Sequence, residues 1–183
     1  MATEESARSF FKANYFAVVG ASNDAAKFGH QVLHWYVRHG FAVTPINPTK
    51  RQILLPSPSA AHQMQALDTL ASLSALQNPE QTSVSIVTPP NVTRKVLQDA
   101  SHLGIHGVWL QPGTYDDEIM EFALENFGIV VAGDGGIHDQ GWWLVSRALQ
   151  QILSDPMTAC LLTGKNLPES VFETPGLTTL VMS

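Results

Sequence analysis

Short apolar runs alternate along the chain with amphipathic stretches, and this alternation predicts the secondary structure. Tyr15–Val19 is the first apolar run, aromatic and β-branched and closed by Gly20, which is typical of a strand. From Gly29 the apolar residues recur at helical spacing as far as Gly40, a glycine placed where helices commonly end. We therefore expect a strand, a short turn and a helix in the first 40 residues.

The same alternation continues to residue 131. We expect further strands at residues 41–46, 83–88, 107–110 and 129–131, and further helices at 91–103, 116–126 and about 142–153. Between the second and third strands, residues 49–58 are expected to be irregular and proline-rich, and residues 60–76 weakly helical.

Strands that alternate with helices indicate a parallel sheet covered on both faces. Right-handed crossovers then give a doubly wound α/β fold, whose five strands, numbered along the chain, we expect in the order 3-2-1-4-5. We expect a single domain over residues 1–183, with its core at about 15–131 and an extra helix and tail in a remodelled segment, 132–183. Such sheets bind ligands beyond the carboxyl ends of their strands, at the switch point beside the first strand.

Composition narrows the class of protein. The chain has 183 residues, of which 44% are hydrophobic and 14% charged, as in a globular domain. Its net charge of -6 argues against general nucleic-acid binding. No apolar run approaches the ~20 residues that cross a bilayer. The acidic start of the chain is unlike a signal peptide. The single cysteine, Cys160, fits a reducing compartment. We expect a soluble, cytoplasmic protein without a nucleic-acid or membrane partner.

The turn after the first strand suits an anion, because the helix that follows presents N–H groups at its start. Gly20, Ala21 and Ser22 keep this turn tight, and Lys27 can neutralise a phosphate, although Lys27 taken alone is better explained as a solvated surface charge. A dinucleotide-binding turn would need further glycines at position 22 and near position 25, where this chain has Ser22 and Ala25. The glycine pattern therefore disfavours NAD.

The end of the second strand, "PINPTKR", disfavours NAD as well, because it offers no acid for the ribose hydroxyls. Lys50 and Arg51 instead place two cations there, which suit a ribose phosphate as in NADP or coenzyme A, unless they are an exposed basic pair. With Lys27 they are the positive charges near the expected crevice of an acidic protein.

Four segments of the chain resemble the motifs of the stand-alone coenzyme A-binding proteins: "VVGASNDAAKFGHQV", "PINPTKR", "SVSIVTPPNVTRKVL" and "GVWLQPG". Those proteins are single Rossmann-like domains similar to the nucleotide-binding domain of the succinyl-CoA synthetase α subunit. The resemblance runs from about residue 15 to residue 131. It implies a domain that binds coenzyme A or an acyl-CoA and has no redox chemistry of its own.

The resemblance also implies which residues bind. The pyrophosphate would be held by Gly20, Ala21, Ser22 and Lys27, and the adenosine side would be lined by Asn47, Pro48 and Lys50. The adenine or the pantetheine arm would be flanked by Thr88, Pro89 and Pro90. The far side of the site would be bordered by Gln111, Pro112 and Gly113. No metal site is expected: His30 and His34 lie four residues apart on the first helix, but no third ligand is evident nearby.

After the fifth strand the chain departs from the family pattern. Members tend to carry a proline-cysteine stretch there, whereas this chain has a glycine turn with Asp134, His138 and Asp139. A carboxylate beside an imidazole supports acid–base chemistry, so the alternative function is a small non-redox enzyme, an isomerase, lyase or cyclase, with Asp134 and His138 as catalytic residues. A polar turn with Asp139 as helix cap explains the same residues. An NADP-dependent reductase is a third alternative.

The C-terminal residues 158–183 are apolar for a chain end. We expect this tail to pack on its own domain or on a second subunit, which leaves a homodimer open. The expected partner is otherwise a small-molecule ligand.

Overall fold

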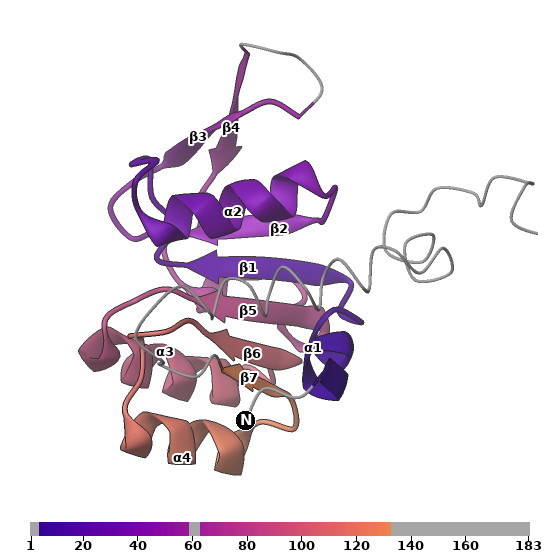
Figure 1. The fold of residues 1–183 in the computed structure, drawn as a ribbon, viewed down its shortest axis with the longest axis vertical. Helices are drawn as coiled ribbons and strands as arrows, with labels where there is room; N and C mark the ends of the chain where they lie inside the picture. Colours follow the sequence, from indigo (N-terminus) through magenta and orange to yellow (C-terminus); the bar gives the residue numbers. More distant parts are fainter. Residues whose placement is uncertain (1–3, 59–62, 133–183) are drawn as a thin grey trace, which may run out of the picture.

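A computed structural model describes residues 4–58 and 63–132 of the chain. A five-stranded parallel sheet forms its centre (Figure 1). The strands, from edge to edge, are β2 (Val43–Ile46), β1 (Tyr15–Val19), β5 (Thr82–Ile86), β6 (Gly107–Leu110) and β7 (Val130–Ala132). The helices are α1 (Glu4–Phe10), α2 (Phe28–Arg38), α3 (Pro90–His102) and α4 (Asp117–Asn126). The predicted doubly wound α/β fold is confirmed.

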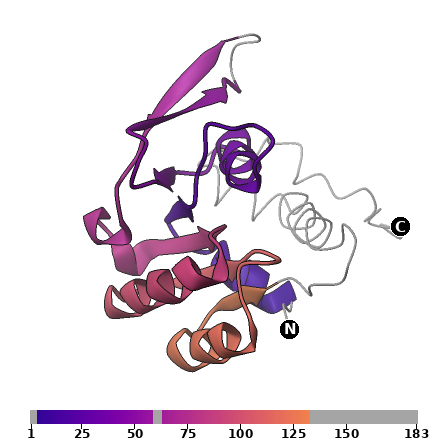
Figure 2. The ribbon, with the colours of Figure 1, turned by 90° about the vertical axis from the view of Figure 1, so that its left-hand side faces the viewer.

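Each face of the sheet is buried under its own helices. Figures 1 and 2 show α2 on one side of the sheet and α3 with α4 on the other. Along β1, Phe16 and Val18 pack into the cluster with α1 and α2, whereas Ala17 and Val19 pack into the cluster with α3 and α4. This is the period of two that a strand imposes on a sequence buried on both sides.

The strand order differs from the predicted 3-2-1-4-5. Numbered along the chain, the five parallel strands lie in the order 2-1-3-4-5, because β5 pairs with β1 and leaves β2 at the edge. The Pro45 carbonyl faces outward and accepts a hydrogen bond from the Leu70 N–H (3.0 Å). Proline has no N–H to offer a further strand on that side, so β2 suits an edge. The switch point therefore lies between β1 and β5.

The segment between β2 and β5 is a β-hairpin, so the prediction of an irregular stretch followed by a weak helix was wrong. β3 (Gln52–Pro56) pairs with β4 (Met64–Asp68) in a separate antiparallel sheet that extends beyond β2 in Figure 1. Ile53 and Leu55 are buried, while Leu54 between them is 48% exposed. This alternation of buried and exposed residues is typical of a strand that is covered on one face. Two short 3₁₀ turns, Leu73–Ala75 and Pro79–Gln81, lead into β5.

Sequence reasoning missed α1, which has only seven residues. Its last residue, Phe10, is fully buried and meets Trp109 edge-on, with ring centroids 5.3 Å apart. The helix predicted at residues 142–153, Cys160 and the apolar tail lie outside the described residues. Within the described part, no helix is long and apolar enough to cross a membrane.

Candidate functional site

The carboxyl ends of the parallel strands bring the residues predicted for ligand binding to one edge of the sheet. Main-chain hydrogen bonds continue past the strand ends: Gly20 N donates to Ile46 O (3.3 Å), Val87 N to Val19 O (2.9 Å) and Gln111 N to Ile86 O (3.2 Å). The turns that begin at Gly20, Asn47, Thr88 and Gln111 therefore line one edge, at the end of β1 and its neighbours.

Two glycines let α2 begin directly against the end of β1. Gly20 has a φ of +92°, and a Cβ there would lie 3.0 Å from the Val87 carbonyl oxygen. A Cβ on Gly29, in the first turn of α2, would lie 2.0 Å from the Gly20 carbonyl oxygen, closer than any side chain allows. Gly29 thus allows the close packing of helix against strand that the third glycine of a dinucleotide-binding turn allows. The loop between strand and helix is longer than in a dinucleotide-binding turn.

Side chains from neighbouring elements hold this loop. Asn47, after β2, donates from Nδ2 to the Ala21 carbonyl (2.7 Å). His30, in the first turn of α2, donates from Nδ1 to the Ser22 carbonyl (2.9 Å), since a carbonyl can only accept. The Ser22 hydroxyl accepts from the Asp24 N–H (3.1 Å). The turn is therefore ordered before any ligand arrives.

The β3–β4 hairpin contributes a further support that the sequence did not reveal. Asn23 donates from Nδ2 to the Gln52 carbonyl (3.0 Å) and accepts at Oδ1 from the Leu54 N–H (2.7 Å). Its amide group thus pairs with the edge of β3 as another strand would. Only the hairpin makes this partner available, and the sequence analysis expected none.

Asn47 orders the turn after β2. Its Oδ1 accepts from the Thr49 N–H (2.8 Å), the Thr49 hydroxyl (3.0 Å) and the Lys50 N–H (2.9 Å). With Nδ2 on Ala21 as well, the Asn47 amide is committed to the chain itself. Asn47 therefore positions the adenosine side of the predicted site, and the exposed Pro48 and Lys50 are the residues there that can meet a ligand.

Lys27 is the N-cap residue of α2 and is exposed. The helix has no side-chain cap hydrogen bond and no acidic residue in its first turn. The partial positive charge at the N-terminus of α2 is therefore not neutralised by a side chain of the first turn. Lys50 and Arg51 are exposed on the neighbouring loop. Lys27 therefore lies at the end of the loop after β1, and Lys50 and Arg51 lie on the loop after the neighbouring strand, β2.

The turn after β5 forms the start of α3. Pro89 is its N-cap and Pro90 its first residue, where a proline costs no hydrogen bond. The Thr93 hydroxyl donates to the Thr88 carbonyl (2.9 Å) and lies 2.9 Å from the Thr88 hydroxyl. Because the single hydroxyl hydrogen of Thr93 is used, Thr88 donates to Thr93 and keeps acceptor capacity.

Gln111, after β6, carries an unsatisfied buried acceptor. The residue is 3% exposed, and its Oε1 has no hydrogen-bond partner among the described residues. Its backbone is fixed: the Thr114 N–H (3.1 Å) and hydroxyl (2.7 Å) both donate to the Gln111 carbonyl. Gly113, in the same turn, has a φ of +82° with open space where a Cβ would be. An unpaired buried amide oxygen costs about 1–3 kcal/mol, which a donor from a ligand or a water molecule would recover.

The candidate catalytic residues Asp134 and His138 lie outside the described residues, as does Asp139. Over residues 4–58 and 63–132, no group of three or more His, Cys, Asp and Glu side chains is placed to hold a metal ion.

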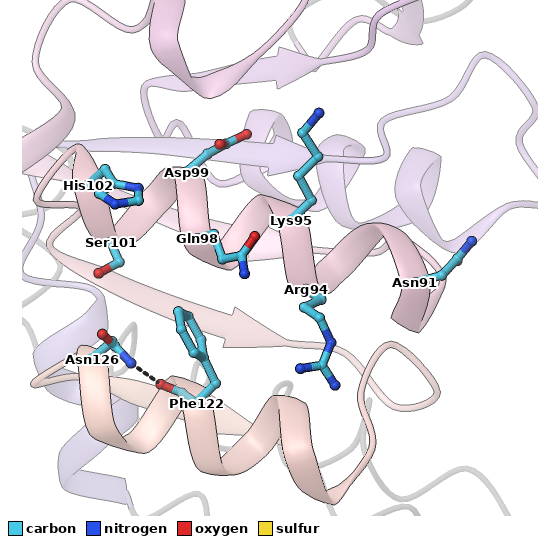
Figure 3. A pocket seen from close by; sticks show the side chains of 9 residues that line it. All are labelled: Asn91, Arg94, Lys95, Gln98, Asp99, Ser101, His102, Phe122 and Asn126. Atoms are coloured by element: carbon cyan, nitrogen blue, oxygen red, sulfur yellow. Dashed lines mark hydrogen bonds between the residues drawn. The ribbon is translucent and has the colours of Figure 1, made fainter.

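A polar groove of about 670 Å³ lies between α3 and α4 and contains none of the predicted site residues (Figure 3). Figure 3 shows Arg94 directed toward α4, with Lys95 and Asp99 directed away from it. Arg94 forms an ion pair with Glu118 (2.5 Å). With charges of both signs and an arginine already paired, this groove is a poorer candidate for an anionic ligand than the carboxyl edge.

Comparison with known families identifies a match that covers this edge. The family model for a CoA binding domain matches residues 14–138, more than half of the chain. This range contains every strand of the parallel sheet and each of the turns described above.

Solved structures agree on the fold. A conserved hypothetical protein from Pyrococcus furiosus is 29% identical (TM-score 0.53, covering 65% of this chain and 91% of that one). A protein from Thermus thermophilus is 27% identical (TM-score 0.56, 71% and 90%). A hypothetical protein from Pyrococcus horikoshii OT3 is 24% identical (TM-score 0.59, 71% and 84%) and shows the fold alone. No match is found among curated proteins.

Proposed function

The chain belongs to the CoA binding domain family, and from this premise we propose that it binds coenzyme A or an acyl-CoA at the carboxyl edge of the sheet. Coenzyme A combines a pyrophosphate, a ribose phosphate, an adenine and a pantetheine arm with two amide groups. Each of these groups has a chemically suitable counterpart at that edge.

The pyrophosphate is assigned to the start of α2. Gly20 and Gly29 bring the helix N-terminus against the end of β1, and Lys27 adds a full positive charge beside it. Gly20, Ala21 and Ser22 carry no bulky side chain that would hold a phosphate away. Because the Ala21 and Ser22 carbonyls are turned to Asn47 and His30, they do not oppose the anion.

The ribose phosphate is assigned to the exposed Lys50 and Arg51. On a chain of net charge -6, two cations next to a helix N-terminus favour a phosphate locally against the overall sign. Thr88, Pro89 and Pro90 offer an apolar turn with one hydroxyl acceptor for the adenine or the pantetheine arm.

The observation that carries the proposal is the unpaired Gln111 Oε1, buried at the same edge. It requires an N–H or O–H donor, and coenzyme A offers pantetheine amides and the adenine amino group. A fully ionised phosphate has no hydrogen to donate to this acceptor, so a ligand with phosphates alone would leave it to water. Gln111, Pro112 and Gly113 are therefore proposed to meet the non-phosphate part of coenzyme A.

Binding is tested by isothermal titration calorimetry with coenzyme A and with NADP. We expect coenzyme A to bind more tightly, and Lys27→Ala to weaken its binding about tenfold or more, as loss of a charge-assisted hydrogen bond does. Lys95→Ala, at the exposed α3–α4 groove, is the matched control and should leave the affinity unchanged. Equal losses in the two variants would refute the assigned phosphate site.

Gln111→Leu separately tests whether the unpaired Gln111 Oε1 meets the ligand. At similar volume it removes the unpaired oxygen together with the Nε2 donor, so the stability of the unliganded protein should change little. Its affinity for coenzyme A should fall because a ligand N–H loses its acceptor. An unchanged affinity would show that Gln111 meets no ligand group.

A further inference from the structure

A second pocket, of about 380 Å³, lies along α2 and is lined mainly by basic and aromatic side chains. His30, His34 and Arg38 follow one another at intervals of four residues, so they share one face of α2. His39 and Trp35 line the same pocket, and β3 adds Pro56. Among the described residues that line it, none is Asp or Glu.

Two of its three imidazoles are fixed in orientation and tautomer. His30 donates from Nδ1 to the Ser22 carbonyl (2.9 Å), and His39 donates from Nδ1 to the Trp35 carbonyl (2.8 Å). Each Nδ1 therefore carries the hydrogen, and each Nε2 is left free of this contact. The His39 ring is stacked on Trp35, with centroids 4.1 Å apart.

The positive charges in this pocket act on one another. Burial, and after it the positive charges of His30 and Arg38, lower the pKa of His34 below its ordinary value of 6.5. Both charged neighbours belong to α2 itself, and the turn after the helix adds His39 to the pocket. The loop before α2 contributes Ala25 and the hairpin contributes Pro56, neither of which titrates. A negative charge in the pocket would reverse this repulsion.

We propose that this pocket is a second anion site, which takes a phosphate-type oxyanion between Arg38 and the imidazoles of His30 and His34. It goes beyond the coenzyme A site, which lies at the carboxyl edge of the sheet. Arg38 supplies a forked, permanently charged donor, and the His34 imidazole supplies a further N–H once it is protonated.

Binding at this site consumes protons. An anion raises the pKa of His34, so between the free and the bound pKa the protein takes up a proton as the anion binds. The affinity therefore rises as the pH falls, by up to about tenfold per pH unit for one proton.

The probe is inorganic phosphate, and the readout is the titration of the His34 imidazole, followed by NMR of the ¹⁵N-labelled full chain. We expect added phosphate to raise the pKa of His34, and the affinity calculated for the phosphate dianion to rise as the pH falls. Arg38→Gln should weaken phosphate binding about tenfold, since it removes a charged donor. His34→Gln should remove the proton uptake. His102→Gln, in the α3–α4 groove, is the matched control and should change neither.

Two further arms identify the source of the anion. A phosphate response that persists when coenzyme A is already bound assigns the site to a separate metabolite. A rise in the His34 pKa with coenzyme A, but not with its form lacking the ribose phosphate, assigns the site to the cofactor's ribose phosphate, in place of Lys50 and Arg51. Either result supports an anion site.

A His34 pKa that neither phosphate nor coenzyme A changes would overturn the proposal. The Lys27→Ala variant separates this outcome from failure of the coenzyme A proposal, because it should bind coenzyme A more weakly and keep the His34 response to phosphate. Each proposal is thus able to fail without the other.

Discussion

The two faces of the parallel sheet are packed with different kinds of side chain. The face toward α1 and α2, here called the aromatic face, contains Phe10, Phe11, Phe16, Tyr36, Phe41 and Trp109. The face toward α3 and α4, here called the aliphatic face, is built mainly of Val, Ile, Leu and Ala, among them Val84, Ile86, Leu97, Val108, Leu110 and Ile119.

Directional contacts are found on the aromatic face. Phe16 stacks on Tyr36 at 5.2 Å, and the Tyr36 hydroxyl lies 2.9 Å from the buried Ser85 hydroxyl. The Ser83 hydroxyl donates to the Phe10 carbonyl (2.8 Å). These contacts fix the positions of α2 and α1 over the sheet, whereas aliphatic packing is non-directional. Since α2 carries the proposed phosphate site at its N-terminus, the face that needs accurate placement has the directional contacts.

The strongest test of this difference is Gly29→Ala. Its Cβ would lie 2.0 Å from the Gly20 carbonyl oxygen, so α2 must move away from β1. We expect a loss of about 4 kcal/mol or more in the free energy of unfolding, the upper end for one substitution. The folded fraction should also lose most of its affinity for coenzyme A.

Chemical denaturation and calorimetry measure both effects. Gly128→Ala is the matched control, because a Cβ at Gly128 meets nothing within 4 Å. Normal coenzyme A affinity in Gly29→Ala would show that the placement of α2 does not set binding.

Leu97→Ala breaks the aliphatic face. Leu97 is fully buried on α3, so its truncation should lower the free energy of unfolding by about 3 kcal/mol through lost burial and a residual cavity. Because α3 can relax without moving the phosphate site on α2, and meets the ligand only through the turn at its start, the coenzyme A affinity of the folded protein should fall much less than in Gly29→Ala. Denaturation followed by calorimetry separates the two quantities, and a matching loss of affinity would contradict the distinction between the faces.

Tyr36→Phe and Ser85→Ala remove the two partners of the buried hydroxyl pair on the aromatic face. Each single change should cost about 1–2 kcal/mol, because it leaves the other hydroxyl buried without this partner. The double variant should cost less than the sum of the two. Burial raises the pKa of Tyr36 well above its usual value, so the effect should be the same at pH 6 and pH 9. Additive losses in denaturation experiments would show that the pair is not coupled.

The elements of the sheet could be predicted from the sequence, but their order could not. Buried β-branched runs such as Tyr15–Val19 identify strands whatever their neighbours are. Periodicity does not say which strands pair, and the signal for β2 as an edge strand was the single Pro45. The hairpin was missed because a local alternation at Ile53–Leu55 was too short to stand out from its proline-rich surroundings.

The candidate site was predictable where turn chemistry alone defines it. Gly20, Lys27 and Gln111 follow from strand ends and a helix start, and the structure places them at one edge. The roles of Asn23 and Gly29 depend on tertiary neighbours, the hairpin edge and the Gly20 carbonyl, which no local pattern contains. The unpaired state of Gln111 is likewise a property of its buried surroundings.

The smallest expected effect concerns the outer side of α2 and the pH dependence of stability. Burial and the neighbouring charges lower the pKa of His34 in the folded chain, so below pH 6.5 the unfolded chain binds more protons there. Stability from this group is therefore complete above pH 6.5 and declines as the pH falls.

His34→Gln should make the free energy of unfolding fall less steeply between pH 7 and pH 5, while His102→Gln should not. Added phosphate should reduce the slope in the parent and leave it unchanged in His34→Gln, because an anion on α2 raises the same pKa that burial lowers. If the free energy of unfolding falls with pH equally steeply in the parent and in His34→Gln, with and without phosphate, His34 contributes neither to the pH dependence of stability nor to the response to phosphate.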